Sequence, residues 1–181
     1  MNNLNPINQT KLFGLDIYLN ELIRLFKNKK YPNKILFSGQ KGIGKCTLAY
    51  HFINYILTID QKDKYDTQNF IININSSEFK TIQNKSNTNL INIDVVDDKK
   101  SIDINQIRIL IETLNKSSFN NKPRFVLIDN IELLNLNSLN ALLKILEEPN
   151  ENIYFILIHN NKKIIPTLLS RCINFRVYLS N

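Results

Sequence analysis

The chain has 181 residues, of which 43% are hydrophobic, and a formal net charge of +7 at pH 7. This length suits one domain and leaves no room for a second full domain, while the even spread of apolar residues argues against global disorder. The positive charge fits a partner rich in phosphate, but most of it comes from scattered lysines, which more often form a solvated surface.

The two cysteines, Cys46 and Cys172, lie far apart and have no CxxC pattern or histidine at ligand spacing. This spacing argues against a zinc site or a disulfide framework. The amino terminus is polar, and the sequence contains no run of about 18 apolar residues. We therefore expect a protein of the reduced cytoplasmic compartment.

The first half of the chain contains a predicted helix, a predicted strand and a second predicted helix. Apolar residues at helical spacing predict a helix over 15–26, and an apolar run predicts a strand over 34–38. A glycine-bearing loop over 39–44 leads into a helix that reaches about residue 57. Residues 60–86 are polar and without a clear period, so we expect a weakly structured insertion there, and we expect residues 1–8 to be flexible.

The second half continues the alternation of strands and helices. A strand is predicted over 90–95, and Asp103 can cap the amino end of a predicted helix that ends at residue 114. Pro149 ends the next helix. The remaining elements are strands over 124–128, 153–158 and 173–177, and helices over 136–146 and 164–169. This order predicts a single α/β domain, residues 1–181, around a five-stranded and mainly parallel sheet.

Residues 39–47 read G-Q-K-G-I-G-K-C-T and fit the phosphate-loop pattern G-x-x-x-x-G-K. In this pattern Gly39, Gly42 and Gly44 let backbone amides turn toward phosphate oxygens, and Lys45 supplies a charge to the outer phosphates. A loop of this kind stands between a strand and a helix, as it does here. The alternative interpretation is a glycine-rich turn with an incidental lysine.

Cys46 departs from this pattern, which has Ser or Thr at that place. The missing hydroxyl normally coordinates magnesium, and a thiol is a poor ligand for so hard a cation. Thr47 comes one residue late and would point elsewhere on the helix. We therefore expect retained ATP binding with weakened magnesium handling.

Residues 124–130 have the form of a Walker B strand, in which Asp129 would hold magnesium through water. The next residue is Asn130, whose amide cannot accept the proton of an attacking water, so hydrolysis should be slow or absent. Glu132 lies two residues further on and is a candidate substitute, although a solvated acid in a turn is the favoured interpretation of it.

Two further motifs carry a family resemblance. Residues 137–149, N-S-L-N-A-L-L-K-I-L-E-E-P, resemble the N-A-L-L-K-x-L-E-E-P signature of bacterial clamp-loader subunits, and residues 166–172, P-T-L-L-S-R-C, resemble their S-R-C motif. Residues 12–14 and 102–110 are similar to the delta-prime branch, so the resemblance covers nearly all of residues 9–178. It implies a three-layer α-β-α P-loop core of the AAA+ family.

The resemblance also implies roles for single residues. The S-R-C arginine works in trans on the terminal phosphate of ATP bound by a neighbouring subunit, and Arg171 is the matching residue; an arginine paired with a surface carboxylate is the alternative. Related ATPases sense the terminal phosphate with a polar residue that ends the fourth strand, which here is His159 or Asn160. Asn130 replaces the catalytic glutamate of active members.

The chain also departs from the family. Members continue past the S-R-C strand into a helical lid and collar, whereas this chain ends at Asn181, as either a fragment or a reduced form of the core alone. Many members carry a zinc-binding cysteine cluster after the phosphate-loop helix, and the corresponding residues 60–69 contain no cysteine.

The favoured function is that of a delta-prime-like subunit of the DNA polymerase III clamp loader, with ATP and magnesium as cofactors. Its partners would be gamma/tau-like and delta-like subunits and, through the assembly, the sliding clamp and primed DNA. Any enzyme activity would be an ATPase activity or that of the polymerase holoenzyme. The alternatives are an ATPase in its own right, an interaction domain that binds no nucleotide, and a small P-loop kinase, which the five unclustered arginines argue against.

Overall fold

The computed structural model describes residues 5–96, 99–116, 120–148, 152–160 and 165–179. These residues form two compact units, each made of more than one stretch of the chain. The helical unit draws on residues 1–31, 41–87 and 177–181, and the sheet unit on residues 32–40 and 88–176. The single domain that the sequence predicts therefore stays a prediction.

The sheet unit contains five strands in the order β2-β3-β4-β1-β5, and every neighbouring pair is parallel. This confirms the expected α/β fold with a mainly parallel sheet. The strands are β1 (Lys34–Gly39), β2 (Leu90–Ile93), β3 (Arg124–Ile128), β4 (Ile153–Asn160) and β5 (Ile173–Arg176).

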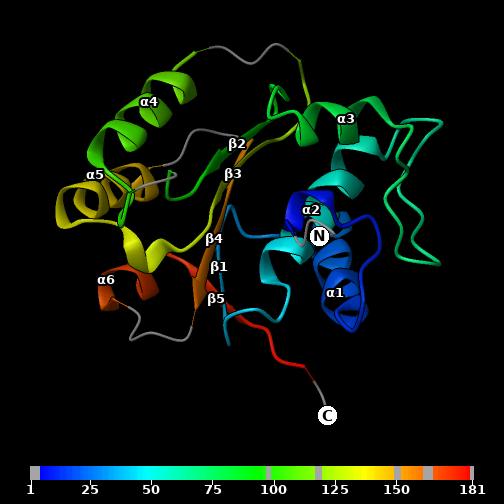
Figure 1. Ribbon diagram of the computed structural model, residues 1–181, viewed down its shortest axis with the longest axis horizontal. Helices are drawn as coiled ribbons and strands as arrows, with labels where there is room; N and C mark the ends of the chain where they lie inside the picture. Colours follow the sequence, from blue (N-terminus) through cyan, green and yellow to red (C-terminus); the bar gives the residue numbers. More distant parts are fainter. Residues whose placement is uncertain (1–4, 97–98, 117–119, 149–151, 161–164, 180–181) are drawn as a thin grey trace. The chain divides into compact units, whose positions relative to one another are not determined.

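Two helices of the sheet unit, α4 (Ile104–Leu114) and α5 (Leu136–Glu147), lie side by side over one face of the sheet (Figure 1). Their apolar faces and the middle strands form one core, in which Ile107, Val126 and Leu142 are fully buried. Each such side chain contributes about 1.5–3 kcal/mol on burial. The core therefore fixes the strand ends that carry the polar residues described below. The 3-10 turn η2 (Ile131–Leu133) and the short helix α6 (Pro166–Leu169) complete this unit.

The helical unit consists of the 3-10 turn η1 (Pro6–Asn8) and the helices α1 (Asp16–Lys27), α2 (Lys45–Thr58) and α3 (Ser77–Gln83). Helices α1 and α2 pack against each other (Figure 1). Phe52 of α2 stacks on Tyr31 with 4.8 Å between ring centroids, and Phe26 of α1 meets both rings edge-on. This aromatic contact fixes the helix that follows the phosphate loop.

Several boundaries differ from those expected. Residues 60–86 include α3, which buries Phe79 and Ile82, and the described part of residues 1–8 forms η1 with Ile7 buried. Strand β2 ends at Ile93, two residues before the expected end, so Asp94 lies beyond the strand. Pro149 and residues 161–164 fall outside the described residues, which include no helix long and apolar enough to span a membrane.

Candidate functional site

The phosphate loop connects β1 directly to α2, as the sequence predicts. Gly42 and Gly44 have φ angles of +85° and +91°, which residues with a side chain rarely adopt. A Cβ atom at Gly42 would meet no atom of the described residues within 4 Å, whereas one at Gly44 would come within 3.1 Å of Leu15 Cδ1. The loop backbone is therefore open at Gly42, and both positions need glycine for their conformation.

Lys45, Cys46 and Thr47 form the first turn of α2, the end of a helix at which backbone amides and the helix dipole favour an anion. Lys45 is only 3% exposed, and Cys46 and Thr47 are half-buried. Successive residues on an α-helix point about 100° apart, so the hydroxyl of Thr47 cannot take the direction of the side chain at position 46. The residue that follows Lys45 therefore presents the thiol of Cys46 where the phosphate-loop pattern has a hydroxyl.

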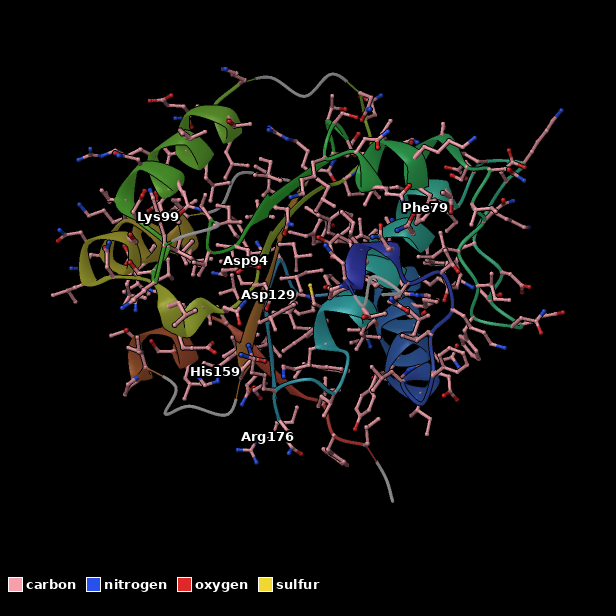
Figure 2. The ribbon with its side chains drawn as sticks, in the orientation of Figure 1. Phe79, Asp94, Lys99, Asp129, His159 and Arg176 are labelled. Carbon is pink, nitrogen blue, oxygen red and sulfur yellow. The ribbon has the colours of Figure 1, made fainter. Side chains whose placement is uncertain are left out.

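The carboxyl ends of β1, β3 and β4 meet at one edge of the sheet, which we call the carboxyl edge. Gly39, which opens the phosphate loop, pairs with Asn160 of β4, and Ile128 of β3 pairs with Leu157 of the same strand. Asp129 follows β3 immediately and therefore lies at this edge, as does His159 (Figure 2). The geometry thus brings Gly39, Asp129 and the end of β4 to the same edge of the sheet.

Asn130 lies at the centre of a polar contact between three strand ends. Its Nδ2 donates to Asp94 Oδ1 at 2.9 Å, and its Oδ1 accepts from Asn160 Nδ2 at 3.0 Å. Its backbone has a left-handed conformation, with φ 52° and ψ 46°, and its amide nitrogen donates to Asp129 Oδ1 at 2.7 Å. Sequence reasoning missed Asp94, because the predicted strand over 90–95 enclosed it.

Two further candidates lie at the carboxyl edge. Glu132 is half-buried in η2, and its Oε2 accepts from the backbone amide of Asn160 at 3.4 Å. It is therefore close to the end of β4. His159 is 3% exposed and pairs with Ser38 in the sheet. Of the two residues that could end the fourth strand in the sensing position, Asn160 is the one whose side chain contacts Asn130.

Arg171 lies at the opposite edge of the sheet, which we call the amino edge. It precedes β5, and Ile173 at the start of that strand pairs with Ile35 near the start of β1. The four residue steps from Ile35 to Gly39 span about 13 Å. Arg171 and the carboxyl edge are thus separated by the length of the strands.

The guanidinium of Arg171 makes contacts within the sheet unit. Its Nη2 pairs with Glu147 Oε1 at 2.5 Å, and its Nη1 donates to the carbonyl oxygen of Thr167 at 3.1 Å. The two paired side chains are 29% and 53% exposed, respectively, while Arg171 Nε is buried and has no hydrogen-bond partner among the described residues. The surface carboxylate that the sequence left as an alternative partner is therefore Glu147, the last residue of α5.

Cys172, the neighbour of Arg171, is 6% exposed, and burial raises the pKa of its thiol to about 11. The thiol therefore stays protonated at neutral pH and behaves as a small apolar group. The described residues contain no cluster of three or more His, Cys, Asp or Glu that could hold a metal ion.

A cavity of about 680 Å³ lies between α4, α5 and the start of β4. Apolar side chains line most of it, and Arg108, Lys144 and Glu148 add charges. The sequence held no signal for this cavity, because it arises from the packing of two helices that are distant along the chain.

Comparison with known proteins gives one matching family and several similar chains. The family described as "DNA polymerase III, delta subunit" matches residues 15–179. The delta' subunit of DNA polymerase III from Buchnera aphidicola subsp. Schizaphis graminum is 31% identical over 161 residues, which cover 88% of this chain and 47% of that protein. The gamma/tau subunit from Mycoplasma genitalium is 31% identical over 173 residues, 94% of this chain and 27% of that protein.

Solved structures share the fold at low sequence identity. A gamma subunit-related protein of DNA polymerase III from Thermotoga maritima has a TM-score of 0.58 and 20% identity, over 90% of this chain and 46% of that one. The Holliday junction branch migration motor RuvB from the same organism has a TM-score of 0.52 and 16% identity, over 96% and 49%. This chain thus spans about half or less of the length of the relatives it matches.

Proposed function

Because this chain belongs to the DNA polymerase III delta subunit family, we propose that it acts as a delta-prime-like clamp-loader subunit. In this proposal it binds ATP weakly, hydrolyses it slowly or not at all, and gives Arg171 to the ATP site of a neighbouring subunit. Its partners are gamma/tau-like and delta-like subunits. The assembly they form would place a sliding clamp on primed DNA during replication.

The position of Arg171 carries this proposal. The phosphate loop begins at the carboxyl edge, where Asp129 also lies, whereas Arg171 precedes β5 at the amino edge. An arginine at the amino edge is better placed to contact ATP bound by another subunit than ATP bound at the carboxyl end of its own β1. A guanidinium suits the work, because it stays charged and can bond two phosphate oxygens at once.

The phosphate loop supports the binding of a nucleotide better than the binding of a catalytic magnesium ion. Backbone amides of residues 39–45 and the Lys45 amine would hold the phosphates of ATP, and the open backbone at Gly42 leaves them room. Asp129 would hold magnesium through water. Cys46 offers this ion a thiol in place of a hydroxyl, which supports weak magnesium binding.

Asn130 supports slow hydrolysis. Water must attack the terminal phosphorus, the bond from that phosphorus to the bridging oxygen must break, and ADP must leave, while a base orients the water or accepts its proton. A neutral amide does not accept this proton at neutral pH. Both ends of the Asn130 amide are also engaged, by Asp94 and by Asn160.

An ATPase active in its own right is the second candidate, and Glu132 is the observation in its favour. Its carboxylate lies within reach of the backbone amide of Asn160, at the carboxyl edge. In that case the purified chain would turn over ATP in the presence of magnesium, and Glu132→Gln would abolish the turnover. A chain that binds no nucleotide at all would instead be an interaction domain.

The test of the trans role mixes the chain with its clamp-loader partners and measures DNA-stimulated ATPase for the native protein and for Arg171→Ala. A trans arginine accelerates phosphoryl transfer by about 10³-fold or more. The neighbouring ATP site that Arg171 contacts should therefore lose its measurable ATPase activity in Arg171→Ala. Arg24→Ala is the matched control, because Arg24 is also an exposed arginine paired with a glutamate, Glu21. Equal rates for the native assembly and the Arg171→Ala assembly would contradict the proposal.

A further inference from the structure

The side chain of Asp94 fixes which way the amide of Asn130 points. A carboxylate only accepts hydrogen bonds, so the group that Asn130 turns toward Asp94 must be its NH₂ donor, at 2.9 Å. The amide oxygen then faces Asn160, whose Nδ2 donates to it at 3.0 Å. The three residues follow β2, follow β3 and end β4, so this chain of hydrogen bonds ties three neighbouring strand ends together.

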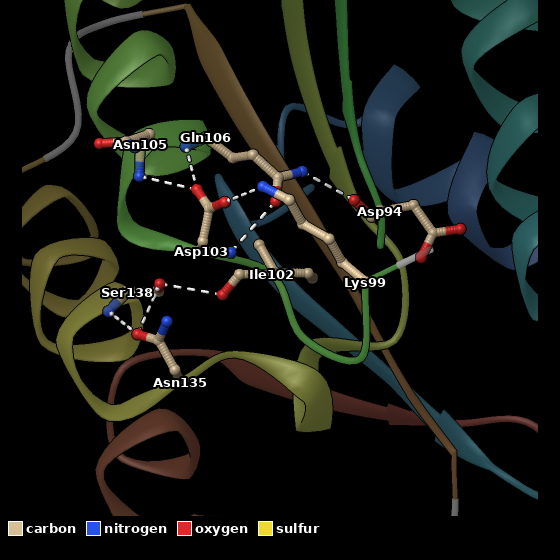
Figure 3. A network of polar contacts seen from close by, with 8 residues as sticks. All are labelled: Asp94, Lys99, Ile102, Asp103, Asn105, Gln106, Asn135 and Ser138. Atoms are coloured by element: carbon tan, nitrogen blue, oxygen red, sulfur yellow. Dashed lines mark hydrogen bonds and ion pairs between the residues drawn. The ribbon is translucent and has the colours of Figure 1, made fainter. Parts of the chain in front are cut away.

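Asp94 is itself held in place. Its Oδ1 also accepts from the backbone amide of Val95 at 2.7 Å, and its carbonyl oxygen accepts from Gln106 Nε2 at 2.8 Å. Gln106 belongs to the first turn of α4, where its Oε1 accepts from the backbone amide of Asp103 at 3.1 Å (Figure 3). The amino end of α4 thus holds the backbone of Asp94 where its carboxylate reaches Asn130.

We propose that Asp94 is a positioning residue, and that positions 94 and 130 form a matched pair with room for one carboxylate and one amide. This inference rests on the proposed function in one respect, because it concerns why the chain does not hydrolyse ATP. Hydrolysis would be slow because of the pair formed by Asp94 and Asn130, and not because of Asn130 alone. A glutamate at position 130 would face the fixed carboxylate of Asp94, which repels it from the position that a base needs.

Exchanging the two groups should therefore let a carboxylate at position 130 take the position that a base needs, which N130E alone does not. In the double variant D94N/N130E, the amide moves to position 94 and can donate to the carboxylate at position 130. The control D103N/N130E removes a nearby carboxylate that contacts Gln106 and Lys99 but, in the described structure, makes no hydrogen bond to Asn130.

The first measurement is urea unfolding of the purified chain, which needs no nucleotide. We expect N130E to lower the urea midpoint of unfolding. Adding D94N to N130E should raise the midpoint again, whereas D94N alone should not raise the midpoint of the native protein. D103N should give no such recovery. Additive shifts for D94N and N130E, or an equal recovery from D103N, would overturn the inference.

The second measurement is ATP binding and hydrolysis in a Cys46→Thr background, which restores the hydroxyl for magnesium. D94N/N130E should hydrolyse ATP about a hundredfold faster than N130E, which is the lower end of what a positioned base contributes. An N130E protein as fast as the double variant would overturn the inference, and so would a double variant that binds ATP without hydrolysing it. If no variant binds ATP, the proposed function fails, and the unfolding comparison still decides whether Asp94 and residue 130 are coupled.

Discussion

His51 of α2 is a buried titratable side chain to which the proposed function gives no part. It is fully buried, its Nε2 contacts the carbonyl oxygen of Gln9 at 3.1 Å, and its Nδ1 contacts the hydroxyl of Tyr65 at 2.8 Å. A neutral ring satisfies both contacts, with Nε2 donating to Gln9 and Nδ1 accepting from Tyr65. Burial lowers the pKa of His51 from 6.5 to about 4, and the contact with Gln9 opposes this only in part.

This lowered pKa predicts that the chain loses stability in mild acid. Between pH 6.5 and about 4 the unfolded chain binds a proton that the folded chain does not, so the free energy of unfolding falls as pH falls through this range. The full effect amounts to about 3 kcal/mol. Urea unfolding at several pH values between 7.5 and 4.5 measures it, and His51→Gln should show a flatter profile. Parallel profiles would contradict the prediction, since carboxylates titrate in both proteins.

Helix α4 shows how a local signal in the sequence also contributes to the contacts at the carboxyl edge. Asp103 Oδ1 accepts from the backbone amides of Asn105 and Gln106, and the Gln106 side chain returns a bond to the backbone of Asp103. The sequence predicted this cap from Asp103 at the start of a helical period. It did not predict that the same glutamine holds Asp94 (Figure 3).

Loss of this cap should destabilise the chain measurably. Asp103→Ala leaves two backbone donors of α4 without their acceptor, so we expect the free energy of unfolding to fall by about 1 kcal/mol. Asp103→Asn retains an acceptor of equal capping strength and gives up only an exposed pair with Lys99, so its loss should be smaller. Urea unfolding of the three proteins decides this, and equal losses for the two variants would show that the cap contributes nothing.

The elements that the sequence predicted are those with a helical period or a continuous apolar run. All five strands and the helices α1, α2, α4 and α5 lie within two residues of their expected bounds. Helix α3 gave no clear period because its seven residues bury only Phe79 and Ile82. The phosphate loop and Asp129 were located by motif, since their spacing is local. The contact of Asp94 with Asn130, and the identity of the carboxylate that pairs with Arg171, were missed because these pairs join residues 36 and 24 positions apart.

The chain passes between the two compact units four times, after residues 31, 40, 87 and 176. Neither unit is a continuous stretch, and the third passage separates α3 from β2. The phosphate loop contains the second passage, because Gly39 and Gln40 belong to the sheet unit and residues 41–47 to the helical unit. Units that share so many connections are expected to unfold together.

We therefore predict a single unfolding transition that ATP shifts as a whole. A ligand at ten times its dissociation constant adds about 1.4 kcal/mol, which for a chain of this size raises the midpoint by roughly 4 °C. Scanning calorimetry with and without ATP measures the shift. Lys45→Met should abolish it. The control Lys62→Met, which changes an exposed lysine of the helical unit, should retain it. Magnesium should add little to the native shift and more to that of Cys46→Thr. Two transitions, of which ATP moves only one, would show instead that the units are separate domains.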